Sequence, residues 1–134
     1  MSNTITRVAV CGLHMKGFPL NSQLTELNAV YVKTAFTAPI YKLYSLPTFP
    51  EKPGLIKVEQ GGSSIEVEIW EISYESLGKF LTMIPSPLGL GQIVLEDDTT
   101  VTGFICEPYI IPHSFDISFH KGWRYYKALQ ETLT

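Results

Sequence analysis

Apolar and polar residues alternate along much of the chain, which is the pattern of half-buried β-strands. The clearest example covers residues 65–72, where Ile65, Val67 and Ile69 share one face and polar residues share part of the other. Alternating or β-branched apolar runs of this kind predict six or seven strands. They cover residues 5–11, 29–36, 40–46, 55–58, 65–72, 92–95 and 100–106.

Three segments have the apolar spacing of short helices, residues 23–27, 75–83 and 123–133. Asn21 or Ser22 can cap the first of them, and Pro85 stops the second. Glycines and prolines concentrate in three loops, residues 12–20, 47–54 and 85–91. Many strands and few helices in so short a chain predict an α+β fold. We expect a small mixed, mostly antiparallel β-barrel with two or three short flanking helices.

The length of 134 residues is that of one domain, covering residues 1–134. With 45% hydrophobic and 17% charged residues, the composition is that of a globular protein. A net charge of -3 disfavours a sequence-independent nucleic-acid binder, which needs a basic face. The sequence has no apolar run long enough to span a membrane and no signal-peptide core at its start. We therefore expect a cytoplasmic protein in which Cys11 and Cys106 are reduced and buried; the alternative is a single bridge between them.

Motifs for metals, nucleotides and nucleophiles are missing from the sequence. The three histidines and two cysteines lack the CxxC, HxxxH and HExxH spacings, so we expect no metal site and no cofactor. The best candidate for chemistry is the loop Gly12-Leu13-His14-Met15, which follows the first strand. A strand that ends in glycine before a short helix can present backbone N–H groups to an anion. The alternative is that His14 is an ordinary exposed or structural residue.

The charged residues leave several roles open. Glu66 and Glu68 share one face of their strand, and we expect that face to be solvated. Glu107 ends a strand, and Asp116 has apolar neighbours, so burial would raise the pKa of its carboxyl. Either carboxylate could act on a ligand or cap backbone groups. Arg124 opens the last helix and could bind a carboxylate, or it could be a surface arginine.

Several stretches taken together resemble a known family. They are VAVCGLHMKGFPLNSQL (8–24), TAPIYKLY (37–44), PGLIKV (53–58), IEVEIW (65–70), IPSPLGLG (84–91), GFICE (103–107), DIS (116–118) and GWRYY (122–126). Their order and spacing resemble the C-terminal domain of allophanate hydrolase over nearly the whole chain. The resemblance implies the fold of the gamma-glutamylcyclotransferase superfamily, a small mixed barrel with flanking helices.

The resemblance also implies a reaction. In that family the domain follows an amidase-signature domain that deaminates allophanate, and it assists decarboxylation of the unstable product, N-carboxycarbamate. The sequence has neither the Gly/Ser-rich nucleophile stretch nor the catalytic lysine of an amidase, so we do not expect it to hydrolyse allophanate by itself. A cyclotransferase carries Tyr-Gly-Ser-Leu where this chain has residues 11–14, and a glutamate at or beside the place of Ile84. Cyclisation of glutamyl groups is therefore disfavoured.

The resemblance places the site around the first loop. It implies that His14 is the catalytic acid or an orienting donor, that the 12–14 turn supplies amides, and that residues 85–91 form the opposite wall. The residues we expect to bind or surround the substrate are Gly12, Leu13, Met15, Tyr41, Tyr44, Trp70, Pro87, Leu88, Gly89, Glu107, Asp116 and Arg124.

Two main hypotheses of function follow, and they belong to different classes. The first is a stand-alone homologue of the domain that binds a small carboxylated urea- or amide-type anion. It would assist decarboxylation in urea and allophanate nitrogen metabolism, beside a separately encoded amidase subunit. The second is a non-catalytic partner of such an amidase, favoured by the apolar Leu13, Met15 and Phe18 in the key loop. A weaker third is gamma-glutamyl cyclotransfer. A homodimer is compatible with each, and neither nucleic acid nor membrane is an expected partner.

Overall fold

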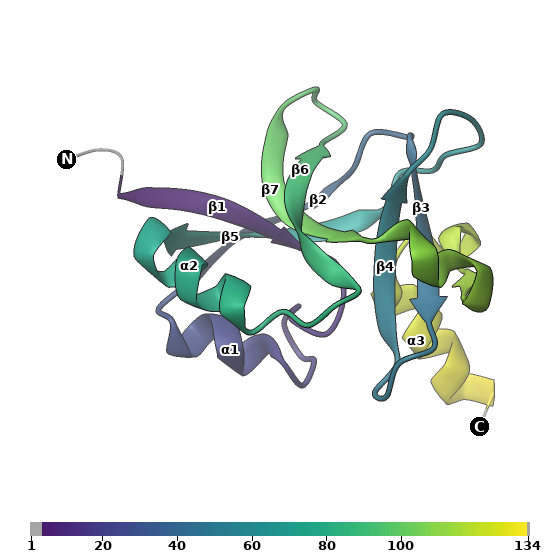
Figure 1. Cartoon of the computed structure of the whole chain (residues 1–134), viewed down its shortest axis with the longest axis horizontal. Helices are drawn as coiled ribbons and strands as arrows, with labels where there is room; N and C mark the ends of the chain where they lie inside the picture. Colours follow the sequence, from purple (N-terminus) through teal and green to yellow (C-terminus); the bar gives the residue numbers. More distant parts are fainter. Residues whose placement is uncertain (1–3, 134) are drawn as a thin grey trace.

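The computed structural model describes residues 4–133, which form two β-sheets and three α-helices (Figure 1). The larger sheet has the strand order β2-β5-β1-β7-β6, and the smaller has the order β4-β3-β8. The strands are β1 (Ile5–Val10), β2 (Val30–Phe36), β3 (Tyr41–Leu46), β4 (Lys52–Lys57), β5 (Glu66–Ser73), β6 (Leu88–Val94), β7 (Thr100–Cys106) and β8 (Phe115–Asp116). The helices are α1 (Asn21–Glu26), α2 (Tyr74–Thr82) and α3 (Trp123–Leu133), with short 3₁₀ turns at Pro108–His113 and Ser118–His120.

The alternating pattern of residues 65–72 forms β5, which lies inside the larger sheet between β2 and β1. β5 pairs antiparallel with both neighbours, whereas β1 and β7 run parallel. Antiparallel pairs make up the rest of both sheets, so the fold is mixed and mostly antiparallel α+β, as expected from the pattern.

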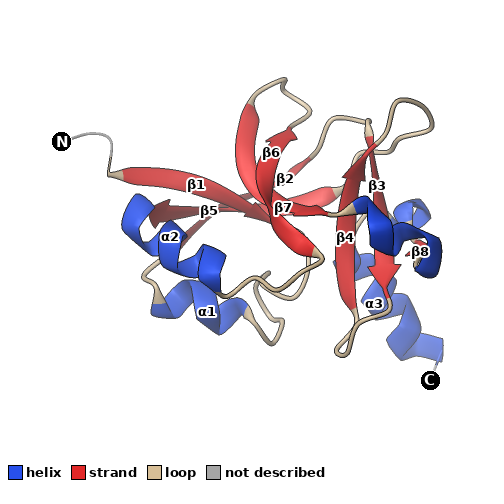
Figure 2. Cartoon of the chain, in the orientation of Figure 1, coloured by secondary structure: helices blue, strands red, loops and turns tan. Residues whose placement is uncertain are grey.

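The expected barrel is not closed. The edge strands β2 and β6 meet at the isolated bridge between Thr37 and Leu95, and the remaining lengths of the two strands are not paired with each other. The smaller sheet stands at a steep angle across the end of β1 and β5 (Figure 2). Gly54 in β4 permits this approach, because a Cβ there would lie 2.9 Å from the Cys106 Sγ at the end of β7.

The helices cover the sheets from two sides. α1 and α2 lie on the same side of β1 and β5, and α3 lies beside β3 and β4 (Figure 1). Ser73 caps α2 by accepting a hydrogen bond from the Ser76 N–H, and Phe80 of α2 is fully buried. The expected cap of α1 is wrong: no side chain caps that helix, and the Asn21 side chain instead donates to the His14 carbonyl at 2.7 Å.

Two loops are shorter than the glycine and proline content predicts. β4 begins at Lys52 and includes Pro53, which the smaller sheet accommodates because β4 is an edge strand. β6 begins at Leu88 and is likewise an edge strand. Among the described residues, no helix is both long and apolar enough to cross a membrane.

Candidate functional site

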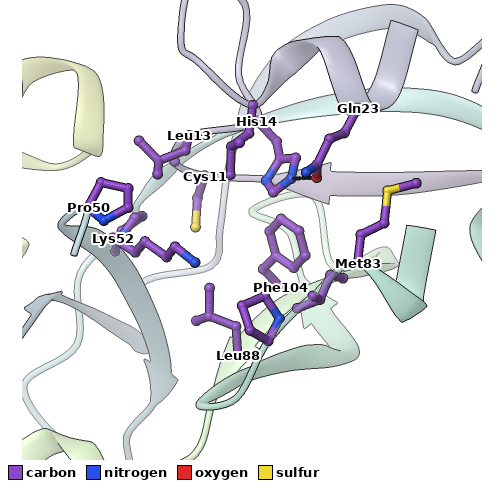
Figure 3. A pocket seen from close by; sticks show the side chains of 14 residues that line it. Cys11, Leu13, His14, Gln23, Pro50, Lys52, Met83, Leu88 and Phe104 are labelled. Atoms are coloured by element: carbon purple, nitrogen blue, oxygen red, sulfur yellow. Dashed lines mark hydrogen bonds between the residues drawn. The ribbon is translucent and has the colours of Figure 1, made fainter. Parts of the chain in front are cut away.

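A cavity of about 250 Å³ opens where the loop after β1 meets β4, the end of α2 and the start of β6 (Figure 3). Its lining is mostly apolar, with a few polar groups contributed by the first loop, α1 and β4. The lining residues are Cys11, Gly12, Leu13, His14, Leu20, Gln23, Pro50, Lys52, Pro53, Met83, Ile84, Pro85, Leu88 and Phe104. Small apolar pockets with a few convergent polar groups are the usual form of ligand sites.

The loop after β1 is folded back on itself by backbone hydrogen bonds. The Met15 N–H donates to the Gly12 carbonyl at 3.0 Å, and the Leu20 N–H donates to the Leu13 carbonyl at 2.9 Å. The N–H groups of Leu13 and His14, at the centre of this turn, donate to no acceptor within residues 4–133. Turn N–H groups without an internal acceptor are the donors from which backbone anion sites are built.

Glycine is required at the start of this loop because β4 passes close to it. A Cβ on Gly12 would lie 2.3 Å from the Cγ of Pro53. No side chain larger than hydrogen fits that spacing without movement. Gly12 thus lets the first loop and β4 form adjoining walls of the same cavity.

His14 is almost completely enclosed, with 8% of its surface exposed. Its Nε2 lies 2.7 Å from the Gln23 Oε1, so the imidazole N–H donates to the amide oxygen and Nδ1 keeps its lone pair. The ring packs between Phe80 and Phe104, with centroids 5.0 Å away in each case. The pKa of His14 is lowered, and desolvation by burial is the main cause. The hydrogen bond with Gln23 acts in the opposite direction and raises the pKa, whereas the nearby charge of Lys52 lowers it further. The imidazole is therefore neutral at neutral pH.

Lys52 carries the one formally charged side chain of the lining, apart from the titratable His14. Its side chain extends into the cavity toward Phe104 (Figure 3). Sequence reasoning missed Lys52 because it placed residue 52 in an irregular loop, whereas β4 begins there. Gln23 was missed as well, since its role depends on the contact with His14 rather than on a motif.

Cys11 lines the cavity but is not a nucleophile. The pKa of the Cys11 thiol is raised to about 12, mainly by burial and to a smaller extent by the neighbouring Cys106. A thiol with that pKa stays protonated and unreactive at neutral pH. Both cysteines are free and buried, in agreement with the expectation from the sequence.

Ile84 lines the cavity at the place where the cyclotransferase pattern puts its glutamate, and no Asp or Glu belongs to the lining. Within residues 4–133, no group of three or more His, Cys, Asp or Glu side chains could hold a metal ion. The cavity therefore offers a cation, a neutral imidazole and backbone amides as its polar groups.

Four of the expected residues line this cavity, Gly12, Leu13, His14 and Leu88. Leu88 and the neighbouring Pro85 form the expected wall from residues 85–91. The structure places the others outside the lining, namely Met15, Tyr41, Tyr44, Trp70, Pro87, Gly89, Glu107, Asp116 and Arg124.

Most of these other residues have structural partners of their own. Met15 is fully buried in the core, and the Tyr41 hydroxyl accepts a hydrogen bond from the Val94 N–H at 2.9 Å. Tyr44 of β3 pairs with Asp116 of β8. Glu107 is exposed just beyond β7.

Asp116 is exposed rather than buried, so the condition for a raised pKa is not met. Desolvation opposes ionisation, but hydrogen bonds from Ser118 and the charge of Lys42 outweigh it and lower the Asp116 pKa. The carboxylate accepts from the Ser118 N–H at 2.9 Å and so caps a backbone group, one of the two roles left open by the sequence.

The expectation of a solvated face for Glu66 and Glu68 is wrong, because only 7% and 4% of these residues are exposed. Each carboxylate has a partner on α3 that covers it. The Arg124 Nη2 donates to the Glu68 Oε2 at 3.0 Å, and the Tyr125 hydroxyl donates to the Glu66 Oε2 at 3.0 Å. Arg124 does bind a carboxylate, but that of Glu68 within the chain.

The chain is similar to known proteins both in sequence and in structure. A family model described as allophanate hydrolase C-terminal domain matches residues 6–128. The urea amidolyase of Lachancea kluyveri is 42% identical over 125 residues, and that of Saccharomyces cerevisiae is 40% identical over 129 residues. These matches cover 90% and 92% of this chain but 7% of each relative, so the chain spans a small part of the curated relatives it matches.

Several solved structures have a similar fold. Kluyveromyces lactis allophanate hydrolase is 40% identical with a TM-score of 0.88, over 92% of this chain and 21% of that chain. A uropathogenic E. coli-specific protein is 31% identical with a TM-score of 0.88, over 93% of this chain and 97% of that chain. An AIG2-like protein of mouse, at 17% identity and a TM-score of 0.62 over 81% of this chain and 83% of that chain, shares the fold. The architecture is thus that of gamma-glutamylcyclotransferase-like proteins, and the E. coli protein shows that it also occurs without the rest of an amidolyase.

Proposed function

Because the chain belongs to the allophanate hydrolase C-terminal domain family, we propose that it binds N-carboxycarbamate, a small carboxylated urea-type anion, and assists its decarboxylation. The observation that carries the proposal is the polarity of the cavity beside His14. Its charged side chain is the cation Lys52, and no carboxylate lines it. Such a cavity attracts a small anion and excludes a cation.

The polar groups match the two carboxylates of this ligand. The Lys52 ammonium pairs with one carboxylate, and the N–H groups of Leu13 and His14 donate to the other. The apolar remainder of the lining strengthens both interactions, because it keeps water and its screening away. A cavity of about 250 Å³ is large enough to hold a ligand of this size.

The reaction needs a proton at nitrogen. As the C–N bond breaks, carbon dioxide leaves and the electron pair stays on the nitrogen, which takes up a proton to give carbamate. Since the His14 imidazole is neutral, we assign it an orienting role, with Nδ1 accepting the N–H of the substrate. The Lys52 ammonium then supplies the proton, which solvent afterwards returns to the amine.

Ligand binding is tested with malonate, which replaces the central nitrogen by a methylene group and is stable. We expect malonate to raise the melting temperature of the protein and to bind in calorimetry. Lys52→Met should abolish both effects, whereas Lys57→Met, an exposed lysine of the same strand, should leave them intact. Equal binding by the Lys52→Met variant would overturn the assignment of the anion site.

Turnover is tested on N-carboxycarbamate formed in situ from carbon-13-labelled allophanate by an amidase that lacks this domain. We expect the protein to accelerate release of labelled carbon dioxide. His14→Ala should abolish that acceleration, and His113→Ala, an exposed histidine outside the cavity, should not. If the His14→Ala variant decarboxylates at the normal rate, the proposed chemistry is wrong.

A second candidate is a non-catalytic partner of an amidase. It is favoured by the K. lactis relative, in which the corresponding region is 21% of a longer allophanate hydrolase chain. Phe49, which is fully exposed beside the lining residue Pro50, is the kind of side chain that a partner would cover. Capture of an amidase together with no response to malonate would support this candidate over decarboxylation.

A further inference from the structure

Glu68 is a carboxylate of β5 enclosed by the first loop and α3, with a side chain that is 6% exposed. Its Oε1 accepts from the backbone N–H of Lys16 at 2.9 Å and from the Trp70 indole N–H at 3.2 Å. Its Oε2 accepts from the Arg124 Nη2 at 3.0 Å. A charge so well enclosed is tolerated only when it is paired and hydrogen-bonded, and here both carboxylate oxygens accept from a donor.

Lys16 is held at both of its backbone polar groups. Its N–H donates to Glu68, and its carbonyl accepts from the same Arg124 Nη2 at 2.9 Å. The Arg124 guanidinium also lies over the ring of Phe18, 5.0 Å from the centroid. The ion pair between Glu68 of β5 and Arg124 of α3 therefore contacts the first loop at Lys16 and Phe18, a few positions beyond His14.

We infer that Glu68 and Arg124 are positioning residues for the site, an inference that takes its ligand from the proposed function. Neither residue lines the cavity. Movement of the first loop would withdraw the Lys16 N–H from Glu68 and leave an enclosed carboxylate short of a donor. That cost opposes displacement of the loop and fixes the His14 ring and the turn amides relative to Lys52.

The neighbouring carboxylate provides a matched control. Glu66 lies on the same strand, is also buried, and accepts from the Tyr125 hydroxyl of the same helix at 3.0 Å. The hydrogen bond given by the Tyr125 hydroxyl goes to Glu66 and not to residues 12–20. Tyr125→Phe thus removes an equivalent β5–α3 hydrogen bond without releasing the loop.

Three measurements separate positioning from mere stability. They are the melting temperature, the affinity for malonate, and the nitrogen chemical shifts of the His14 imidazole in two-dimensional NMR. Arg124→Met and Glu68→Gln should each shift the His14 signals and weaken malonate binding on the order of tenfold, which is the effect expected when a hydrogen bond to a charged ligand is lost. Arg124→Lys, which keeps the charge, should recover part of the affinity, and Tyr125→Phe should leave the signals and the affinity unchanged.

The double variant Glu68→Gln with Arg124→Met is the sharpest case. Because this variant lacks both the Glu68 carboxylate and the Arg124 guanidinium, no buried charge is left unpaired. Its melting temperature should therefore be closer to that of the original protein than the melting temperature of the Arg124→Met variant is. Its affinity should stay weak, because the Lys16 carbonyl has lost its donor. Two results would overturn the inference. In the first, the malonate affinity and the His14 chemical shifts change only in proportion to the melting temperature. In the second, neither of them changes in the Arg124→Met variant. If the original protein does not bind malonate yet Arg124→Met still shifts the His14 signals, the proposed function fails and the positioning stands.

Discussion

Gly12→Ala tests whether close packing of the first loop on β4 builds the cavity. The added methyl would lie 2.3 Å from the Cγ and 2.6 Å from the Cδ of Pro53. Carbon atoms in contact are normally about 3.5–4.0 Å apart, so the overlap exceeds about 1 Å. Pro53 has little freedom to yield, because its ring is rigid and its strand pairs with β3 at Ser45.

Overpacking of this kind costs about 1–3 kcal/mol of the free energy of unfolding. For a chain of 134 residues, a change of 1 kcal/mol moves the melting temperature by roughly 4 °C. We therefore expect Gly12→Ala to melt about 4–12 °C below the original protein. Malonate affinity should fall as well, since the two walls of the cavity are pushed apart.

Differential scanning fluorimetry with and without malonate measures both effects. Gly89→Ala is the matched control, because it lies in β6 next to the cavity and a Cβ there meets nothing within 4 Å. Adding Pro53→Ala to Gly12→Ala removes the two clashing atoms and leaves the Pro53 Cβ position, 3.7 Å away. The double variant should recover most of the lost stability, a non-additive result. A normal melting temperature for Gly12→Ala, or no rescue by Pro53→Ala, would refute the packing argument.

Two further predictions concern titratable groups. Desolvation by burial opposes ionisation of Glu51, but hydrogen bonds from Ser45 and from α3 outweigh it, so the Glu51 pKa is lowered. A carboxylate with a lowered pKa stabilises the folded state at pH values above its unfolded pKa of about 4.3. Glu51→Gln should cost about 1 kcal/mol at pH 7, and the difference in melting temperature should shrink as the pH falls below about 4; a difference independent of pH would contradict this. Burial is the main cause that raises the pKa of Cys11 to about 12 and that of Cys106 to about 11. Neither thiol should therefore react with a disulfide reagent at about pH 8 until the protein unfolds. Rapid labelling of the folded protein would contradict this prediction.

The strand segments could be predicted because alternation is a local property of the chain. All seven segments expected from the pattern are present, and β4 and β6 begin at Lys52 and Leu88, earlier than expected. In both cases the glycines and prolines of an edge strand predict a loop, because these residues are more typical of turns. The two-residue strand β8 could not be foreseen, because its pairing with β3 depends on tertiary contact rather than on residue type.

Alternation indicates which residues share a face of a strand, but not what covers that face. Glu66 and Glu68 share a face as expected, yet α3 packs there and brings Arg124 and Tyr125 to the two carboxylates. Nothing within residues 65–72 records that α3 supplies these partners. Burial of charged residues therefore depends on partners distant in sequence.

The sequence by itself determined most of the strands and the family, since both depend on short patterns and on their order along the chain, and it predicted a site at the loop that holds His14. Only the tertiary structure decided that Lys52 and Gln23 line the same cavity as His14 and that Glu107 and Asp116 do not. Lys52, Gln23 and His14 belong to separate elements and meet because Gly12 and Gly54 allow the smaller sheet to pack closely on the end of the larger one. That packing is a property of the whole chain, and no local pattern encodes it.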